Sequence, residues 1–175
     1  MTRRTLPWFL LLVLLLVTAA STLGSCRKKV RTDWRVQSML GGRANVLAVS
    51  APTEVRAFRI EDAGAPSDVG PYKIVGPSLT VDEAVGKRLS TILMSDDTYD
   101  WQRVKRMPWT PKVGLAFMRH GVRIDLAVCL ESDQIVVFKG GMYINCEDTD
   151  TARAAWLAAL RDALPNDAYL ASLTP

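Results

Sequence analysis

The sequence predicts an α+β fold, in which an antiparallel β-sheet, with a meander in its C-terminal half, packs two helices on one face. Three strand-like runs follow one another between residues 113 and 139, separated by turn residues. Apolar residues recur at helical spacing over 81–94 and again over 151–164. The order of strands, helix, antiparallel strands and helix favours a single domain over residues 44–175, with both helices on one side of the sheet.

The first half of this domain changes pattern several times along the chain. A short apolar run stands at residues 46–49. From residue 54 the pattern predicts a half-exposed strand, a loop with Gly and Pro breakers and a second strand, over 54–60, 61–71 and 72–75. Thr80 is expected to cap the helix that follows, because Glu83 three residues later completes a capping box.

The second half predicts the meander and the last helix. Its strands are expected over 113–119, 122–130 and 134–139, with a short fourth run at 142–145. Turn residues such as Gly121 and Gly140-Gly141 separate them. Leu126, Val128, Ile135 and Val137 should share a buried sheet face, covered by Leu157 and Leu160 of the last helix, which ends at Pro165.

The N-terminal 25 residues have the pattern of an export signal. Arg3 and Arg4 precede ten apolar residues at 8–17, and small residues follow. That run is shorter than the roughly 20 apolar residues a spanning helix needs. Leu23-Gly24-Ser25-Cys26 then resembles the lipobox of bacterial lipoproteins, which implies cleavage before Cys26 and lipid on its sulfur. The alternative is a plain secretory signal cut nearby, with Cys26 incidental.

Residues 26–43 are expected to be a lipidated Cys and a basic tether. Residues 1–43 hold eight basic side chains and one acidic one, whereas 44–175 hold 14 basic and 17 acidic ones. The folded part is therefore mildly acidic, and a nucleic-acid surface is not expected. The competing interpretation of 27–43 is an amphipathic turn of Trp34, Val36, Met39 and Leu40 docked on the domain. Arg27 directly after the Cys favours the outer membrane, by resemblance to known sorting signals.

Two cysteines remain in the exported part, Cys129 and Cys146. An oxidising compartment would allow a disulfide between them. Counting residues through the expected turns, however, puts Cys129 opposite Gln134 and Cys146 opposite Ile135, on different sheet faces. Two separate thiols are therefore the better expectation, and a single bulge would reverse the assignment of faces.

For each of the other candidate functional residues, a purely structural role is the favoured interpretation. His120 is the single histidine and stands at an expected turn, with no partner to orient it as a base and no second ligand for zinc. Asp96, Asp97 and Asp100 lack the spacing of an EF-hand loop. Aromatic residues interleave with basic ones over 99–112, so that Tyr99, Trp101 and Trp109, with Tyr143, could form a ligand or glycan platform. Burial of these large rings in a loop that covers the sheet is the favoured interpretation.

Several tracts together resemble a group of uncharacterised bacterial exported proteins. They are Asp97-Thr98-Tyr99-Asp100, Lys105, Met107-Pro108, Val113-Gly114-Leu115-Ala116-Phe117, Ile124-Asp125-Leu126-Ala127-Val128-Cys129-Leu130 and Leu164-Pro165-Asn166-Asp167. In that group a "sY" segment leads to "P-G-v-x-x-x-F" and "l-l-C-F-x-C" strands and an "F-P" helix end. The resemblance covers roughly residues 54–167 and implies no activity. Ser132 stands in place of the second Cys of "C-F-x-C", which puts any disulfide or metal site of the group in doubt here.

The sequence thus predicts a membrane-anchored lipoprotein of the bacterial envelope, a non-catalytic interaction component without a cofactor. Its expected partners are membrane lipid, through Cys26, and an envelope protein. The alternative is a ligand- or glycan-binding accessory lipoprotein that uses the 99–112 loop. An enzyme acting on envelope material is the third possibility.

Overall fold

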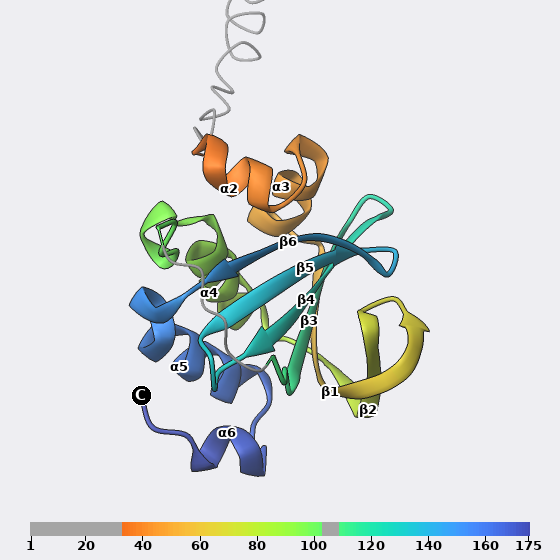
Figure 1. The fold of residues 1–175 in the computed structure, drawn as a ribbon, viewed down its shortest axis with the longest axis vertical. Coiled ribbons are helices and arrows are strands. Elements are labelled where there is room, and N and C mark those ends of the chain that lie inside the picture. Colours follow the sequence, from red (N-terminus) through yellow and green to blue (C-terminus); the bar gives the residue numbers. More distant parts are fainter. Residues whose placement is uncertain (1–32, 103–108) are drawn as a thin grey trace, which may run out of the picture. The chain divides into compact units, whose positions relative to one another are not determined.

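The computed structural model describes residues 33–102 and 109–175, which confirm the α+β class (Figure 1). Within these ranges one antiparallel sheet has the strand order β2-β1-β3-β4-β5-β6. The strands are β1 (Glu54–Ser67), β2 (Gly70–Thr80), β3 (Val113–Arg119), β4 (Val122–Cys129), β5 (Gln134–Lys139) and β6 (Met142–Asp148). The helices are α2 (Trp34–Met39), α3 (Arg43–Ser50), α4 (Glu83–Met94), α5 (Arg153–Ala163) and α6 (Ala168–Ser172), with 3-10 turns at Asp96–Thr98 and Asp150–Ala152.

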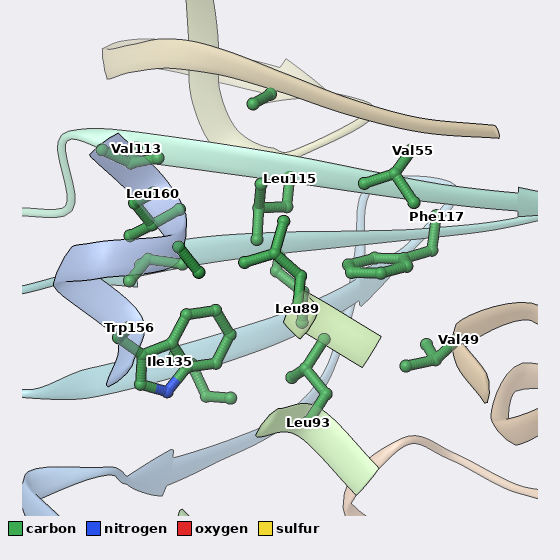
Figure 2. Close-up of a cluster of buried hydrophobic side chains, with 14 of the residues drawn as sticks. Val49, Val55, Leu89, Leu93, Val113, Leu115, Phe117, Ile135, Trp156 and Leu160 are labelled. Atoms are coloured by element: carbon green, nitrogen blue, oxygen red, sulfur yellow. The ribbon is translucent and has the colours of Figure 1, made fainter. Parts of the chain in front are cut away.

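The main core lies between one face of the sheet and helices α3, α4 and α5 (Figures 1 and 2). Strand residues at every second position point into it, as in Leu126 and Val128. The predicted shared face is confirmed, since the four strand residues and both helix residues belong to one buried cluster. Figure 2 shows Leu89 and Leu93 of α4 and Trp156 of α5 filling the same space.

The predicted helices differ slightly at their ends from the observed ones. Helix α4 begins at Glu83, because the carboxylate of Asp82 rather than Thr80 accepts the Ala84 N–H at the cap. Helix α5 follows a 3-10 turn, and β6 is longer than the expected fourth run. Helix α6 was not expected. It begins at the cap Asp167 directly after the Leu164–Asn166 turn.

The expected tether is wrong for residues 33–43, because this segment is folded onto the domain. Asp33 caps helix α2, and Val36, Met39 and Leu40 are fully buried in the main core. A β-carbon on Gly41 would stand 2.7 Å from Ile144 of β6, so the chain passes close to the sheet here. The domain therefore begins no later than Asp33. The competing interpretation of a docked amphipathic turn holds for Val36, Met39 and Leu40 but not for Trp34, which is exposed.

The expected loop over 61–71 is also wrong, since β1 and β2 form a long ribbon through most of it. The pairs Ile60↔Ile74 and Asp62↔Tyr72 continue the ladder, which becomes irregular between Asp62 and Ser67. Pro71 is tolerated because β2 is at the sheet's edge, where a strand can lack an N–H donor. Pro66 belongs to β1 and lies in the irregular stretch between Asp62 and Ser67. The ribbon curves away from the rest of the sheet (Figure 1).

This bend gives the second face of the sheet a smaller core of its own. Its members come from the ribbon and from the strands it faces: Phe58, Ile60, Val69, Tyr72, Ala116, Ala127, Val136 and Phe138. Gly70 in the bend lies directly against the ring of Phe138. The N–H of Gly141, in the β5–β6 turn, donates to the carbonyl of Asp68 at 3.1 Å. The ribbon is therefore fastened to the opposite end of the sheet.

Candidate functional site

Two of the predicted platform residues pack in the main core: Tyr99 is part of it and Trp101 packs against it. Tyr99 is 4% exposed, its hydroxyl donates to the Leu93 carbonyl at 2.6 Å, and burial raises its pKa. The Trp101 ring packs on it with centroids 4.8 Å apart, and the guanidinium of Arg35 lies 5.2 Å from the Trp101 ring centre. These contacts are those of a structural cluster that holds α2 against the segment after α4.

The third platform residue, Trp109, belongs to the other face of the sheet. It packs on the second core, the cluster that contains Tyr72 and Phe138. Tyr143 lies beside Phe138 on that face, with ring centroids 6.5 Å apart. The structure therefore does not bring Tyr99, Trp101 and Trp109 together into one ligand surface. The basic residues at 103, 105 and 106 lie outside the described residues.

The positions of His120 and of the acidic residues Asp96 and Asp97 are explained by the local structure. His120 is exposed in the β3–β4 turn, with a φ of 46° that the turn with Gly121 requires. Asp96 is paired with Arg35, and the Asp97 carbonyl accepts the Thr151 hydroxyl at 2.8 Å. Among the described residues, no group of three or more His, Cys, Asp or Glu side chains is placed to hold a metal ion.

The two cysteines are free thiols on the same face of the sheet. Cys129 lies opposite Gln134 as expected, but Cys146 lies opposite Val136 and not Ile135. The cause is a bulge in β6, which shifts the register between Val137 and Phe138. The expectation of opposite faces is therefore wrong. The pair is nevertheless unbonded, since β5 lies between their strands and two strand spacings exceed the Cα separation of a disulfide.

A charged pair that the sequence did not reveal joins β4 to the ribbon, and its acid is buried while its base is partly exposed. Asp125 on β4 is fully buried, and Arg123 donates to one of its oxygens from Nε at 3.0 Å and Nη2 at 2.8 Å. Arg123 also reaches Asp68 in the ribbon at 3.0 Å. Burial raises the pKa of Asp125 to about 6, although Arg123 opposes the rise. Strand alternation could not reveal the pair, because it puts Asp125 with Arg123 on the face opposite Leu126, the side expected to be exposed.

A cleft of about 490 Å³ lies where the end of α3 and the start of β1 meet the start of α4. Val55 and Gly86 form apolar wall, and Glu54, Glu83 and Lys87 contribute charge. Ser90 also lines it. This side chain is 5% exposed, and its hydroxyl has no hydrogen-bond partner among the described residues. A buried hydroxyl without a partner is unfavourable, so this position suits a ligand that supplies one.

The outer side of helices α2 and α3 carries exposed apolar residues. Trp34 is 74% exposed and Leu47 is 49% exposed, although their helices bury the opposite sides. Residues 34–53 include Arg35 and Arg43 but no acidic residue. Sequence spacing predicted the docked side of α2 only as an alternative, and that alternative is wrong for Trp34. Trp34 precedes Val36 by two positions, which puts it on the opposite side of the helix. The helices within the described ranges are all too short or too polar to cross a membrane.

Comparison with known proteins identifies no relative. No protein-family model, no curated protein and no solved structure matches the chain. The resemblance to exported bacterial proteins therefore stays a prediction from the residues quoted for it. Cys26, the predicted lipidation site, lies outside the described residues.

Proposed function

We propose that this chain is a lipid-anchored protein of the bacterial envelope whose folded domain acts by binding and not by catalysis. The observation that carries the proposal is the Leu23-Gly24-Ser25-Cys26 sequence directly after an apolar run of signal-peptide length. The early start of the domain, no later than Asp33, adds support. A domain that begins within a few residues of the lipidated Cys would be held at the membrane surface.

The binding role rests on how the titratable side chains are arranged. A nucleophile needs a base within hydrogen-bonding reach, and a base needs a group that orients it. In the described part of the chain His120 is exposed at a turn and Asp125 is engaged by Arg123. By the same criterion, neither thiol is an activated nucleophile in the described structure. Burial also raises the pKa of Cys146 to about 11, which disfavours the reactive thiolate.

Lipid labelling tests the anchor. Bacteria that express the full chain should incorporate labelled palmitate into the wild type, and Cys26→Ala should abolish the label and leave a precursor of about 19.3 kDa. Cys129→Ala is the matched control, since it changes a buried thiol and should leave labelling intact. Absence of label in the wild type, or normal maturation of Cys26→Ala, would contradict the proposal.

A small-ligand role at the α3–β1–α4 cleft is the second candidate function. It is favoured by the buried hydroxyl of Ser90, which has no hydrogen-bond partner in the part of the chain that the structure describes. The ligand-binding alternative, predicted from the sequence for the 99–112 loop, is thus proposed for this cleft instead. Ser90→Ala removes the hydroxyl with little change of shape, so the ligand-free protein should become about 1 kcal/mol more stable. A panel of envelope sugars and polyamines should then stabilise the wild type against heat more than Ser90→Ala. Equal shifts in both proteins would remove the cleft from consideration.

A further inference from the structure

We propose that the outer side of helices α2 and α3 lies on the anionic lipid surface that holds Cys26. The inference rests on the proposed function, because it requires the lipid on Cys26. It adds an orientation: the domain would not hang from a flexible tether but would rest on the bilayer through this helical layer. Trp34, Arg43 and Leu47 would be the residues in contact with lipid.

Chain length places this layer at the membrane. Eight peptide steps separate Cys26 from Trp34. A fully extended chain advances at most about 3.6 Å per residue, so Trp34 would stay within about 29 Å of the lipidated Cys. Helix α2 is the first described element after Cys26, and it is fixed to the domain through Val36 and Met39. Helix α2 is therefore held near the membrane, and its exposed side, which carries Trp34, is within reach of the lipid.

The side chains on that free side suit the interface between lipid and water. Trp is enriched there because its ring is apolar and its N–H stays hydrogen-bonded. Trp34 is the most exposed of the large apolar side chains in the described residues, and Leu47 extends the apolar surface onto α3. Gln37 and Ser38 complete the exposed side of α2 without charge. A water-facing helix would be expected to carry charged residues at these positions.

The charges also fit an anionic surface. Arg27, Lys28, Lys29 and Arg31 precede the helices, and residues 34–53 contain no acidic side chain. Basic residues near the bilayer are attracted by anionic headgroups. Arg43 opens helix α3 and is exposed, so it is available for the same contact.

Other exposed apolar residues are less suited to the lipid. Ile74 and Val75 are successive residues of the edge strand β2 and face opposite sides, so only Val75 and Leu79 share a face. Met142 and Tyr143 are exposed at the start of β6. The Tyr143 ring packs edge-to-face against Phe138 of the second core. Neither group is close in sequence to the anchor. Among the surfaces of residues 33–102 and 109–175, the α2–α3 layer combines exposed apolar residues, positive charge and closeness in sequence to Cys26.

The test uses the full chain processed by bacteria, extracted in lipidated form and reconstituted into phosphatidylcholine–phosphatidylglycerol vesicles. Brominated lipids should quench part of its tryptophan fluorescence, and Trp34→Phe should lose most of that quenching. The other three tryptophans of the exported part are less exposed, and Trp156 is fully buried. Leu47→Asp and Arg43→Glu should weaken the quenching of Trp34, whereas Ile74→Asp, an exposed apolar change on β2, should not.

Several outcomes would overturn the inference. Equal quenching of wild type and Trp34→Phe would mean that another surface faces the lipid. Shielding of Trp34 from aqueous iodide only at high protein density would assign the surface to a second copy of the chain. The failure of the anchor itself is distinguishable, because the intact mass of the extracted protein then shows no lipid. A lipidated protein with unquenched Trp34 contradicts only the docking.

Discussion

Arg123 and Asp125 lie two residues apart on strand β4, and the guanidinium donates two hydrogen bonds to one oxygen of the carboxylate. The other oxygen, Oδ2, is buried without a partner among the described residues. The same guanidinium binds Asp68 in the β1–β2 ribbon. One cation therefore joins the buried sheet position to the segment that covers it, and the carboxylate it holds is incompletely satisfied.

This arrangement predicts an unusual pH dependence. Burial raises the pKa of Asp125 to about 6, above its ordinary value of 3.8, so the folded state binds the proton more tightly than the unfolded state does. The contribution of Asp125 to stability is therefore gained as pH falls from about 6 to about 4, and lost as pH rises again. A shift of two units corresponds to about 3 kcal/mol at most.

Urea unfolding of wild type and Asp125→Asn between pH 7 and pH 4 measures this effect. The wild type should gain up to about 3 kcal/mol relative to the variant over that range, because the contributions of the other acids cancel in the difference. Arg123→Gln removes the group that lowers the pKa, so the midpoint of the gain should move upward. Parallel pH profiles for wild type and Asp125→Asn would show that Asp125 has an ordinary pKa.

The meander could be predicted closely because its signals are local. Strands β3 and β5 have the predicted bounds, since alternating apolar residues and turn glycines at β3–β4 and β5–β6 fix them. The ribbon could not be predicted, because its Gly and Pro residues are tolerated only at the edge strand β2 or in the irregular stretch of β1, and both depend on the whole sheet. The bulge in β6 reversed the face of Cys146 for a similar reason: one extra residue in a strand leaves no clear local signal.

Prediction of the candidate surfaces depended even more on contacts between residues that are far apart in the sequence. Spacing placed Val36, Met39 and Leu40 on one side of a helical turn, but a basic segment of the same composition could also have stayed solvated. Only contact with β6, as at Gly41 and Ile144, decides between the two. Likewise Trp101 and Trp109 are eight residues apart in sequence and join different cores, which interleaving of aromatic and basic residues cannot reveal.

The buried sheet face predicts a large cost for truncation at its centre. Leu126 is fully buried between its strand neighbours and the helices, so Leu126→Ala should lower the free energy of unfolding by about 2–5 kcal/mol. Leu79→Ala, a change of the same size on the exposed side of β2, should cost about 0.5 kcal/mol or less. Chemical denaturation measures both. Similar costs would mean that the core is not where the structure places it.

Helix α2 predicts that the N-terminal segment stabilises the domain. Met39→Ala should cost about 2–5 kcal/mol, since the side chain is fully buried in the main core. Gln37→Ala, on the exposed side of the same helix, should stay within about 0.5 kcal/mol of the wild type. Deleting residues 27–42 should lower the melting temperature for the same reason. An unchanged melting temperature would restore the interpretation of this segment as a tether.

The bend of the ribbon allows a matched test of two glycines. Gly64 and Gly70 have nearly the same backbone conformation, with φ of 62° and 63°, which an alanine adopts only with strain. A β-carbon on Gly64 would meet nothing within 4 Å, whereas one on Gly70 would overlap the ring of Phe138. Both substitutions should cost about 1–2 kcal/mol in backbone strain. Gly70→Ala should cost about 1–3 kcal/mol more through overpacking.

A double-mutant cycle assigns the extra cost of Gly70→Ala to the contact with Phe138. Phe138→Leu makes room at the ring edge, so the cost of Gly70→Ala should fall in that background while the cost of Gly64→Ala stays the same. Equilibrium unfolding of the four variants and the wild type gives both differences. Equal costs at the two glycines would mean that the ribbon does not close over Phe138. The second core would then be open to solvent, and Asp68, through Arg123 and the Gly141 N–H, would remain as the contact of the bend with the far strands.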